Sequence, residues 1–113
     1  MADFAEVLFF SSLVSTLLLL VAGSIGYYLM GRGIIGIAVS QLATTIGILL
    51  VFIDVLSRAT LFGIFFSNIF IVGVGVLVYY WVDDSLFSVE LFQLFAGGIV
   101  VLFFKDLVGV LSI

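Results

Sequence analysis

Polar positions divide the chain into four long apolar segments. Each segment holds 23 to 25 residues, which is roughly 35 Å at the helical rise of ~1.5 Å per residue. That length crosses the ~30 Å hydrocarbon core of a bilayer with a modest tilt. The period-two alternation of strands is missing, and a membrane strand needs only about ten residues. The pattern predicts an all-α integral membrane protein with helices over residues 7–30, 34–56, 59–82 and 86–110.

The connections between these segments are short and polar. They read Gly31-Arg32-Gly33, Ser57-Arg58 and Asp83-Asp84-Ser85. Loops this tight make neighbouring helices antiparallel. We therefore expect one membrane-embedded domain over residues 1–113, folded up-down-up-down as two tandem helical hairpins.

The chain carries an internal repeat. A shift of 52 residues superimposes Tyr27-Tyr28 on Tyr79-Tyr80, Gln41-Leu42 on Gln93-Leu94, and Asp54 on Asp106. Residue types that are rare in this chain therefore agree between the halves. We interpret residues 1–56 and 57–113 as two copies of one hairpin, which are parallel repeats because each contains two spans.

Composition limits the chemistry that the chain can perform. Hydrophobic residues make up 65% and charged residues 9%, whereas soluble domains carry about a quarter charged residues. Cysteine, histidine and proline are absent, so no zinc, haem, iron–sulfur or Cys/His catalytic site can form. We expect no enzyme activity, no metal and no catalytic residue. The net charge of −4 argues against direct, sequence-specific nucleic-acid binding.

The amino terminus, Met-Ala-Asp-Phe-Ala-Glu, is acidic. It lacks the positive region of a secretory signal. We expect the first helix to be retained.

Polar and small side chains within the spans are candidate helix-packing sites. Small residues let helices approach closely, and hydroxyls or amides can hydrogen-bond between helices. A path for a polar substrate, or an ion-ligand role for the two deep amides of the third and fourth spans, is the alternative. The candidates are Gly36, Ser40, Gln41, Thr44, Thr45, Gly47, Asn68 and Gln93.

The charged residues lie near the predicted ends of the spans, and no span has an ionisable group near its centre. Coupled transport needs such a group, so we expect none from this chain alone. The loop charges are candidates for contacts between subunits or with lipid headgroups, and solvated charges of little energetic consequence are the alternative. They are Arg32, Asp83, Asp84, Arg58 and Lys105.

The stretch VAGSIGYYLMGRGIIGIAVSQLATTIGILLVF, Val21 to Phe52, resembles the hairpin of conjugative pilins of type IV secretion systems. The shared pattern is a glycine-containing apolar helix, a tight loop with a basic residue, here Arg32, and a second apolar helix with small residues. The resemblance implies a subunit that assembles from the membrane into a tube and brings phospholipid with it. Pilins of that family usually have one hairpin, and the second loop here is acidic.

The segment from Arg32 to Leu50 also resembles the small three-helix membrane subunit of respiratory complex I. The position of that family's intramembrane glutamate is here Gln41, and the corresponding position in the third span is Asn68. Both acids are therefore missing, and the fourth helix is extra.

Together these patterns favour a non-enzymatic, self-assembling membrane subunit, with a pilin-like role in conjugation or DNA transfer. The expected surroundings are the lipid bilayer and copies of itself or other membrane subunits, and an extracellular filament after assembly. The alternatives are an accessory subunit of a respiratory or ion-translocating complex, and a small homodimeric carrier or channel.

Overall fold

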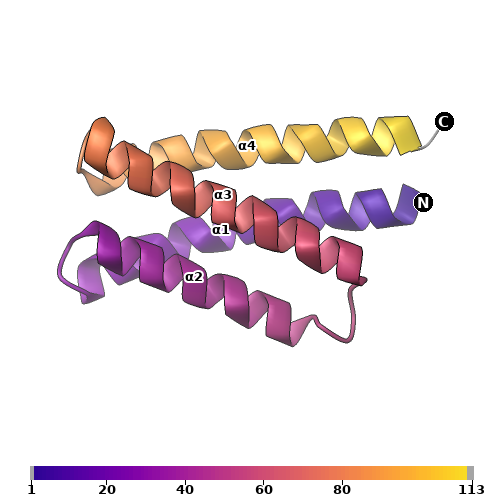
Figure 1. Cartoon of the computed structure of the whole chain (residues 1–113), viewed down its shortest axis with the longest axis horizontal. Coiled ribbons are helices and arrows are strands. Elements are labelled where there is room, and N and C mark those ends of the chain that lie inside the picture. Colours follow the sequence, from indigo (N-terminus) through magenta and orange to yellow (C-terminus); the bar gives the residue numbers. More distant parts are fainter. Residues whose placement is uncertain (1, 112–113) are drawn as a thin grey trace.

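The computed structural model describes the backbone of residues 2–111, with side chains from 6 to 106. The described chain is four α-helices joined by short connections (Figure 1). They are α1 (Ala2–Leu29), α2 (Ile34–Val51), α3 (Arg58–Trp81) and α4 (Leu86–Leu111). In lipid the backbone must satisfy its own hydrogen bonds, which long apolar helices do. The predicted all-helical class is confirmed.

The second helix is shorter than predicted. It ends at Val51, whereas the apolar pattern extended it to residue 56. Phe52 closes the helix by donating its N–H to the Ile48 carbonyl, and the Leu56 N–H returns to the Phe52 carbonyl in a separate turn. Residues 52–57 are needed to reverse the chain, so hydropathy alone placed this boundary wrongly.

Glycine ends the first helix. Gly31 has φ +95° and Arg32 has φ +58°, and the Arg32 N–H bonds back to the Tyr27 carbonyl. This left-handed closure is common at helix C-termini, and glycine adopts it without steric cost. The reversal lets α2 return directly along α1.

Hydroxyl and carboxylate side chains cap the third and fourth helices. Ser57 accepts a hydrogen bond from the Thr60 N–H, and Ser85 accepts one from the Ser88 N–H, both at 3.2 Å. Asp83 in turn accepts from the hydroxyls of Ser88 at 2.7 Å and Ser85 at 2.9 Å. The start of α4 is therefore held by a small group of polar side chains, of which Asp83 and Ser85 lie before the membrane-spanning segment.

These hydrogen bonds, first from Ser88 and then from Ser85, lower the pKa of Asp83. Because the pKa of Asp83 is lower in the folded protein than in the unfolded one, its ionised carboxylate stabilises the fold at pH values above the unfolded pKa. That stabilisation is lost as the pH falls through the folded pKa. We expect Ser88→Ala to raise the pKa of Asp83 and Ser88→Thr to leave it low. Carboxyl NMR titration in detergent measures both. An unchanged value in Ser88→Ala would contradict the role of this hydrogen bond.

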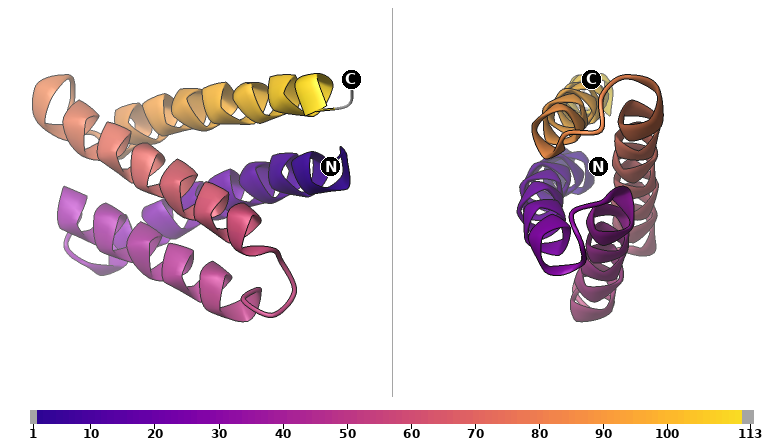
Figure 2. Two further views of the ribbon diagram at one scale, coloured as in Figure 1. Left: turned by 45° about the vertical axis from the view of Figure 1, so that its right-hand side comes forward. Right: turned by 90° about the vertical axis from the view of Figure 1, so that its left-hand side faces the viewer.

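The helices form an antiparallel bundle in which α1 contacts each of the other three. α2 and α4 stand on opposite sides (Figure 2). Towards the chain termini, α1 stays beside α4 while α2 diverges from α1 together with α3 (Figures 1 and 2). The divergence opens space beside the end of α2.

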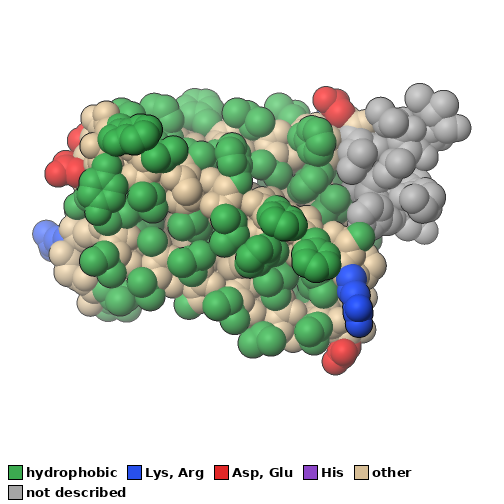
Figure 3. All heavy atoms as spheres, in the orientation of Figure 1, with side chains coloured by type: hydrophobic (Ala, Val, Ile, Leu, Met, Phe, Trp, Pro, Cys, Tyr) green, Lys and Arg blue, Asp and Glu red, His purple; other side chains and the backbone are tan. Residues whose placement is uncertain are grey.

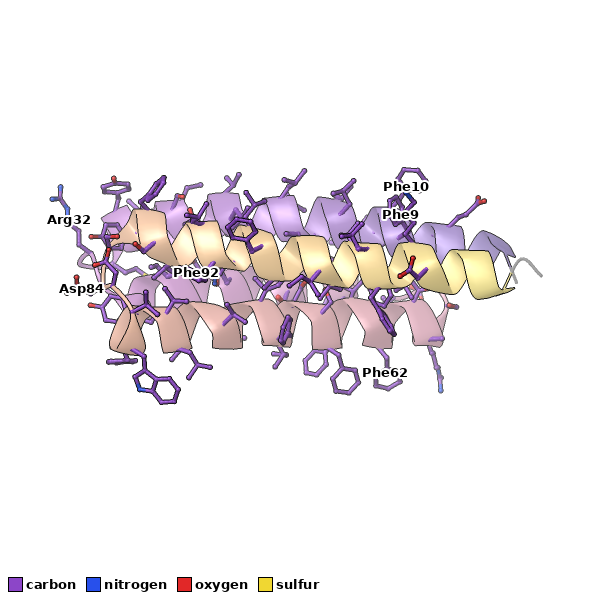
Figure 4. All side chains as sticks on the ribbon, turned by 90° about the horizontal axis from the view of Figure 1, so that it is seen from above. Phe9, Phe10, Arg32, Phe62, Asp84 and Phe92 are labelled. Atoms are coloured by element: carbon purple, nitrogen blue, oxygen red, sulfur yellow. The ribbon has the colours of Figure 1, made fainter. Side chains whose placement is uncertain are left out.

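On the face shown in Figure 3, apolar side chains spread over the surface and charged ones lie at its two ends. All four helices are long and apolar enough to cross a membrane, over Glu6–Leu29, Ile34–Val51, Arg58–Trp81 and Leu86–Asp106. Large side chains such as Phe62 and Phe66 are more than half exposed, and Figure 4 shows Phe62 projecting away from the bundle. Exposure on this scale suits lipid as the surrounding solvent.

Candidate functional site: the polar interior of the bundle

Two glutamines form a reciprocal amide pair inside the bundle. Gln41 of α2 donates its Nε2 to Gln93 Oε1, and Gln93 of α4 donates its Nε2 to Gln41 Oε1, both at 2.8 Å. Both side chains are fully buried. The pair joins two helices that stand on opposite sides of the bundle.

Each glutamine also donates to a backbone carbonyl of the first helix of its own hairpin. Gln41 Nε2 reaches the Leu19 carbonyl at 3.0 Å, and Gln93 Nε2 reaches the Ile71 carbonyl at 3.2 Å. We call these two side chains and two carbonyls the amide clasp. Its two amide oxygens and two amide nitrogens are thus all hydrogen-bonded, which removes the penalty for burying them.

Glycines make room for the clasp. A Cβ atom added at Gly23 would meet the Gln41 amide, and one added at Gly75 would meet the Gln93 amide. Gln41 and Gln93, Leu19 and Ile71, and Gly23 and Gly75 are each 52 residues apart, the shift of the sequence repeat. The clasp is therefore built from corresponding positions of the two halves, while the duplication itself stays a prediction.

A second set of buried polar side chains continues from the clasp towards the termini. Ser15 donates its hydroxyl to Asn68 Oδ1 at 2.6 Å, and Asn68 Nδ2 donates to Thr45 Oγ1 at 3.0 Å. The Thr45 hydroxyl donates to the Gln41 carbonyl at 2.9 Å. This network links α1, α2 and α3, so hydrogen bonds connect all four helices.

Glu90 is the charged side chain that penetrates the bundle. It is half-buried on α4 and accepts a hydrogen bond from the Ser24 hydroxyl of α1, while its Oε2 is buried without a partner. It lies one turn inside the start of α4, so it remains close to the membrane interface. Glu90 corresponds to Ala38 in the repeat, and its partner Ser24 corresponds to Val76. Both counterparts are apolar, so the repeat-related pair cannot form the same hydrogen bond.

Most predicted packing residues face the interior of their own chain. Gly36, Gln41, Thr45, Asn68 and Gln93 are buried, and a Cβ added at Gly36 would collide with the Gly26 backbone of α1. Ser40 and Thr44 are half-buried, and their hydroxyls donate to carbonyls of their own helix. Gly47 is exposed, and a Cβ there would meet nothing within 4 Å. The predicted packing residues thus mainly make intramolecular contacts with α1, α3 and α4.

The predicted loop charges fall at the two ends of the bundle. Arg32 and Asp84 share one end (Figure 4), where the Arg32 guanidinium lies 5.6 Å from the centre of the Tyr28 ring. Asp83 accepts a hydrogen bond from the capping Ser85 hydroxyl at that end. Arg58 begins α3 at the other end, and Lys105 lies exposed near the end of α4. The structure brings none of these side chains into the polar interior.

Sequence reasoning missed the contacts of the polar interior. It named Asn68 and Gln93 as candidate packing residues but assigned them no partner, and it did not connect Ser15 with Asn68 or Ser24 with Glu90. For the glutamines a signal existed, because the repeat related Gln41 to Gln93 as equivalent positions. For the other contacts the sequence offers no comparable signal, since they join positions that the repeat does not relate.

The arrangement is suited to holding helices together. The clasp and network consist of amides and hydroxyls whose hydrogen bonds are directed at one another. Among residues 6–106, no group of three or more His, Cys, Asp or Glu side chains could hold a metal ion. Comparisons with protein-family models, with curated proteins and with solved structures give no match.

Proposed function

We propose that this protein is a non-enzymatic structural subunit of a membrane assembly and that its copies associate side by side in the bilayer. The supporting observation is the face of α2 from which α1 diverges towards the chain termini (Figure 1). Ala43 and Gly47 are exposed one turn apart on this face, and a Cβ at Gly47 would have open space around it. Small residues at this spacing let a second helix approach closely in lipid.

The polar interior supports the same proposal, because its side chains are occupied within the chain and are not free to bind another subunit. Its amides are engaged within the chain, so the clasp is a fixed crosslink between helices. Association with other subunits must then use the apolar exterior. In its finer form the proposal follows the pilin resemblance: the subunits leave the membrane together as a filament containing phospholipid.

A leucine at position 47 tests the association. Gly47→Leu fills the open face of α2 and is expected to weaken self-association about tenfold or more, because an overpacked helix contact costs ~1–3 kcal/mol. Energy transfer between fluorescently labelled copies in liposomes measures the self-association. A cysteine added in a terminal tag carries the label at a single position, because the sequence has no cysteine of its own. Gly73→Leu, on the outer face of α3 with equally open space, is the matched control.

Association that is equal in both variants would contradict the α2 contact, and a monomer at all protein-to-lipid ratios would contradict self-assembly. The finer form has a separate readout. Filaments sheared from cells should contain this chain together with phospholipid. Recovery only in membranes, bound to a fixed set of other proteins, would instead favour an accessory subunit of a larger complex.

A further inference from the structure

An open crevice lies where α2 ends and α3 begins. It has a volume of about 730 Å³, within the range of small-molecule sites. Its walls are apolar and come from both helices. They consist of Leu49, Leu50, Ile53, Leu61, Phe62 and Phe65.

Two opposite charges complete the lining. Asp54, in the turn after α2, and Arg58, the first residue of α3, both face the crevice, and both are exposed. Figure 3 shows basic and acidic side chains at this end of the α2–α3 pair. The crevice therefore has an apolar wall along the helices and a carboxylate and a guanidinium at the helix ends.

The helix ends reinforce this separation of charge. The C-terminal end of α2 carries partial negative charge, and the N-terminal end of α3 carries partial positive charge. An anion is thus favoured beside Arg58 and a cation beside Asp54. A guanidinium is well suited to a phosphate, and a carboxylate to an ammonium group.

We propose that this crevice binds one phospholipid whose headgroup carries a primary ammonium, as in phosphatidylethanolamine. The phosphate bonds to Arg58, the ammonium donates to Asp54, and an acyl chain lies against Phe62 and Phe65. This inference is independent of self-association, since it concerns one chain and its lipid.

The corresponding place in the other half of the repeat is unsuited to this ligand. Asp106 corresponds to Asp54, but Glu6 corresponds to Arg58, so a carboxylate stands where the phosphate needs a cation. α1 also stays beside α4 there (Figure 1). The two halves therefore supply an internal comparison. Asp54 and Asp106 are equivalent in the repeat, and only Asp54 is expected to bind the headgroup.

Native mass spectrometry of the purified full chain tests the proposal, with phosphatidylethanolamine, phosphatidylcholine and phosphatidylglycerol offered in equal amounts. We expect one phosphatidylethanolamine to be retained preferentially, because the quaternary ammonium of phosphatidylcholine cannot donate and phosphatidylglycerol has no ammonium. Asp54→Asn should lower the retained phosphatidylethanolamine about tenfold, the effect of one charged hydrogen bond. Arg58→Ala should lower retention of all three lipids.

Asp106→Asn is the matched control and should leave retention unchanged. Helix content by circular dichroism verifies that each variant is folded. We expect the variants to fold, because the three substituted positions are exposed. Equal retention of the three lipids by the unaltered protein would overturn the proposal. So would equal effects of Asp54→Asn and Asp106→Asn.

Discussion

Gln41→Leu is expected to lower the free energy of unfolding by about 1 to 2 kcal/mol, and Gln93→Leu by a similar amount. Each substitution removes the pair of hydrogen bonds between the two side chains. It also leaves the other glutamine with a buried amide oxygen and one buried N–H unpaired, while its second N–H keeps the backbone carbonyl. That remaining penalty, more than the lost attraction, is the reason for the expected effect.

The double variant Gln41→Leu, Gln93→Leu distinguishes this account from simple loss of volume. With both amides gone no buried polar group is orphaned, so its destabilisation should be smaller than the sum of the single effects by about 1 kcal/mol. Reversible unfolding in mixed detergent micelles, followed by circular dichroism, gives the three values. Thr44→Val is the control, because the Thr44 hydroxyl bonds only within its own helix, to the Ser40 carbonyl at 2.8 Å. Additive single effects would contradict a coupled clasp.

The helices could be predicted from the sequence because a lipid environment strongly constrains which residues a membrane-spanning segment can contain. Every span must be apolar over the thickness of the bilayer and must satisfy its own backbone, so segment length and polarity identify it. The exception is the end of α2. Residues from Phe52 to Val55 are as apolar as a span apart from Asp54, but the chain must turn before Ser57 caps α3. Hydropathy reports the burial of residues in lipid and does not report such a reversal.

The partners inside the bundle were less accessible to sequence reasoning. A repeat relates positions that are equivalent, and equivalent positions touch only where the two halves meet. Gln41 and Gln93 do so through hydrogen bonds, whereas Tyr27 and Tyr79, which the repeat relates equally well, share no hydrogen bond among the described contacts and pack against the same apolar cluster. Which equivalent pair meets is decided by how the hairpins pack.

The divergence of the helices explains a further difference. Gly36 and Gly47 are eleven residues apart, about three turns, and therefore point in nearly the same direction from α2. Helical spacing alone would therefore put both on one packing face. Yet Gly36 meets Gly26 of α1 while Gly47 meets nothing, because α2 leaves α1 along its length (Figure 1). Helical spacing gives the direction of a side chain but not the distance to the neighbouring helix.

The contact at Gly36 leads to the second prediction, a large loss of stability in Gly36→Leu. A Cβ added at Gly36 would collide with the backbone carbonyl of Gly26, and one added at Gly26 would collide with that of Gly36. Backbone atoms cannot turn aside as a flexible side chain can. The helices α1 and α2 must separate, and overpacking of this kind costs ~1–3 kcal/mol or more.

Separation of α1 from α2 should also disturb the clasp, since Gln41 reaches the Leu19 carbonyl from α2. We therefore expect Gly36→Leu to exceed either glutamine variant in the same micelle unfolding measurement, and Gly36→Ala to cost about 2 kcal/mol. Gly47→Ala is the matched control on the same helix. Its Cβ meets nothing, and alanine is the better helix former by ~1 kcal/mol, so its stability should be unchanged or raised. Equal effects of alanine at positions 36 and 47 would show that α1 and α2 do not meet at Gly36.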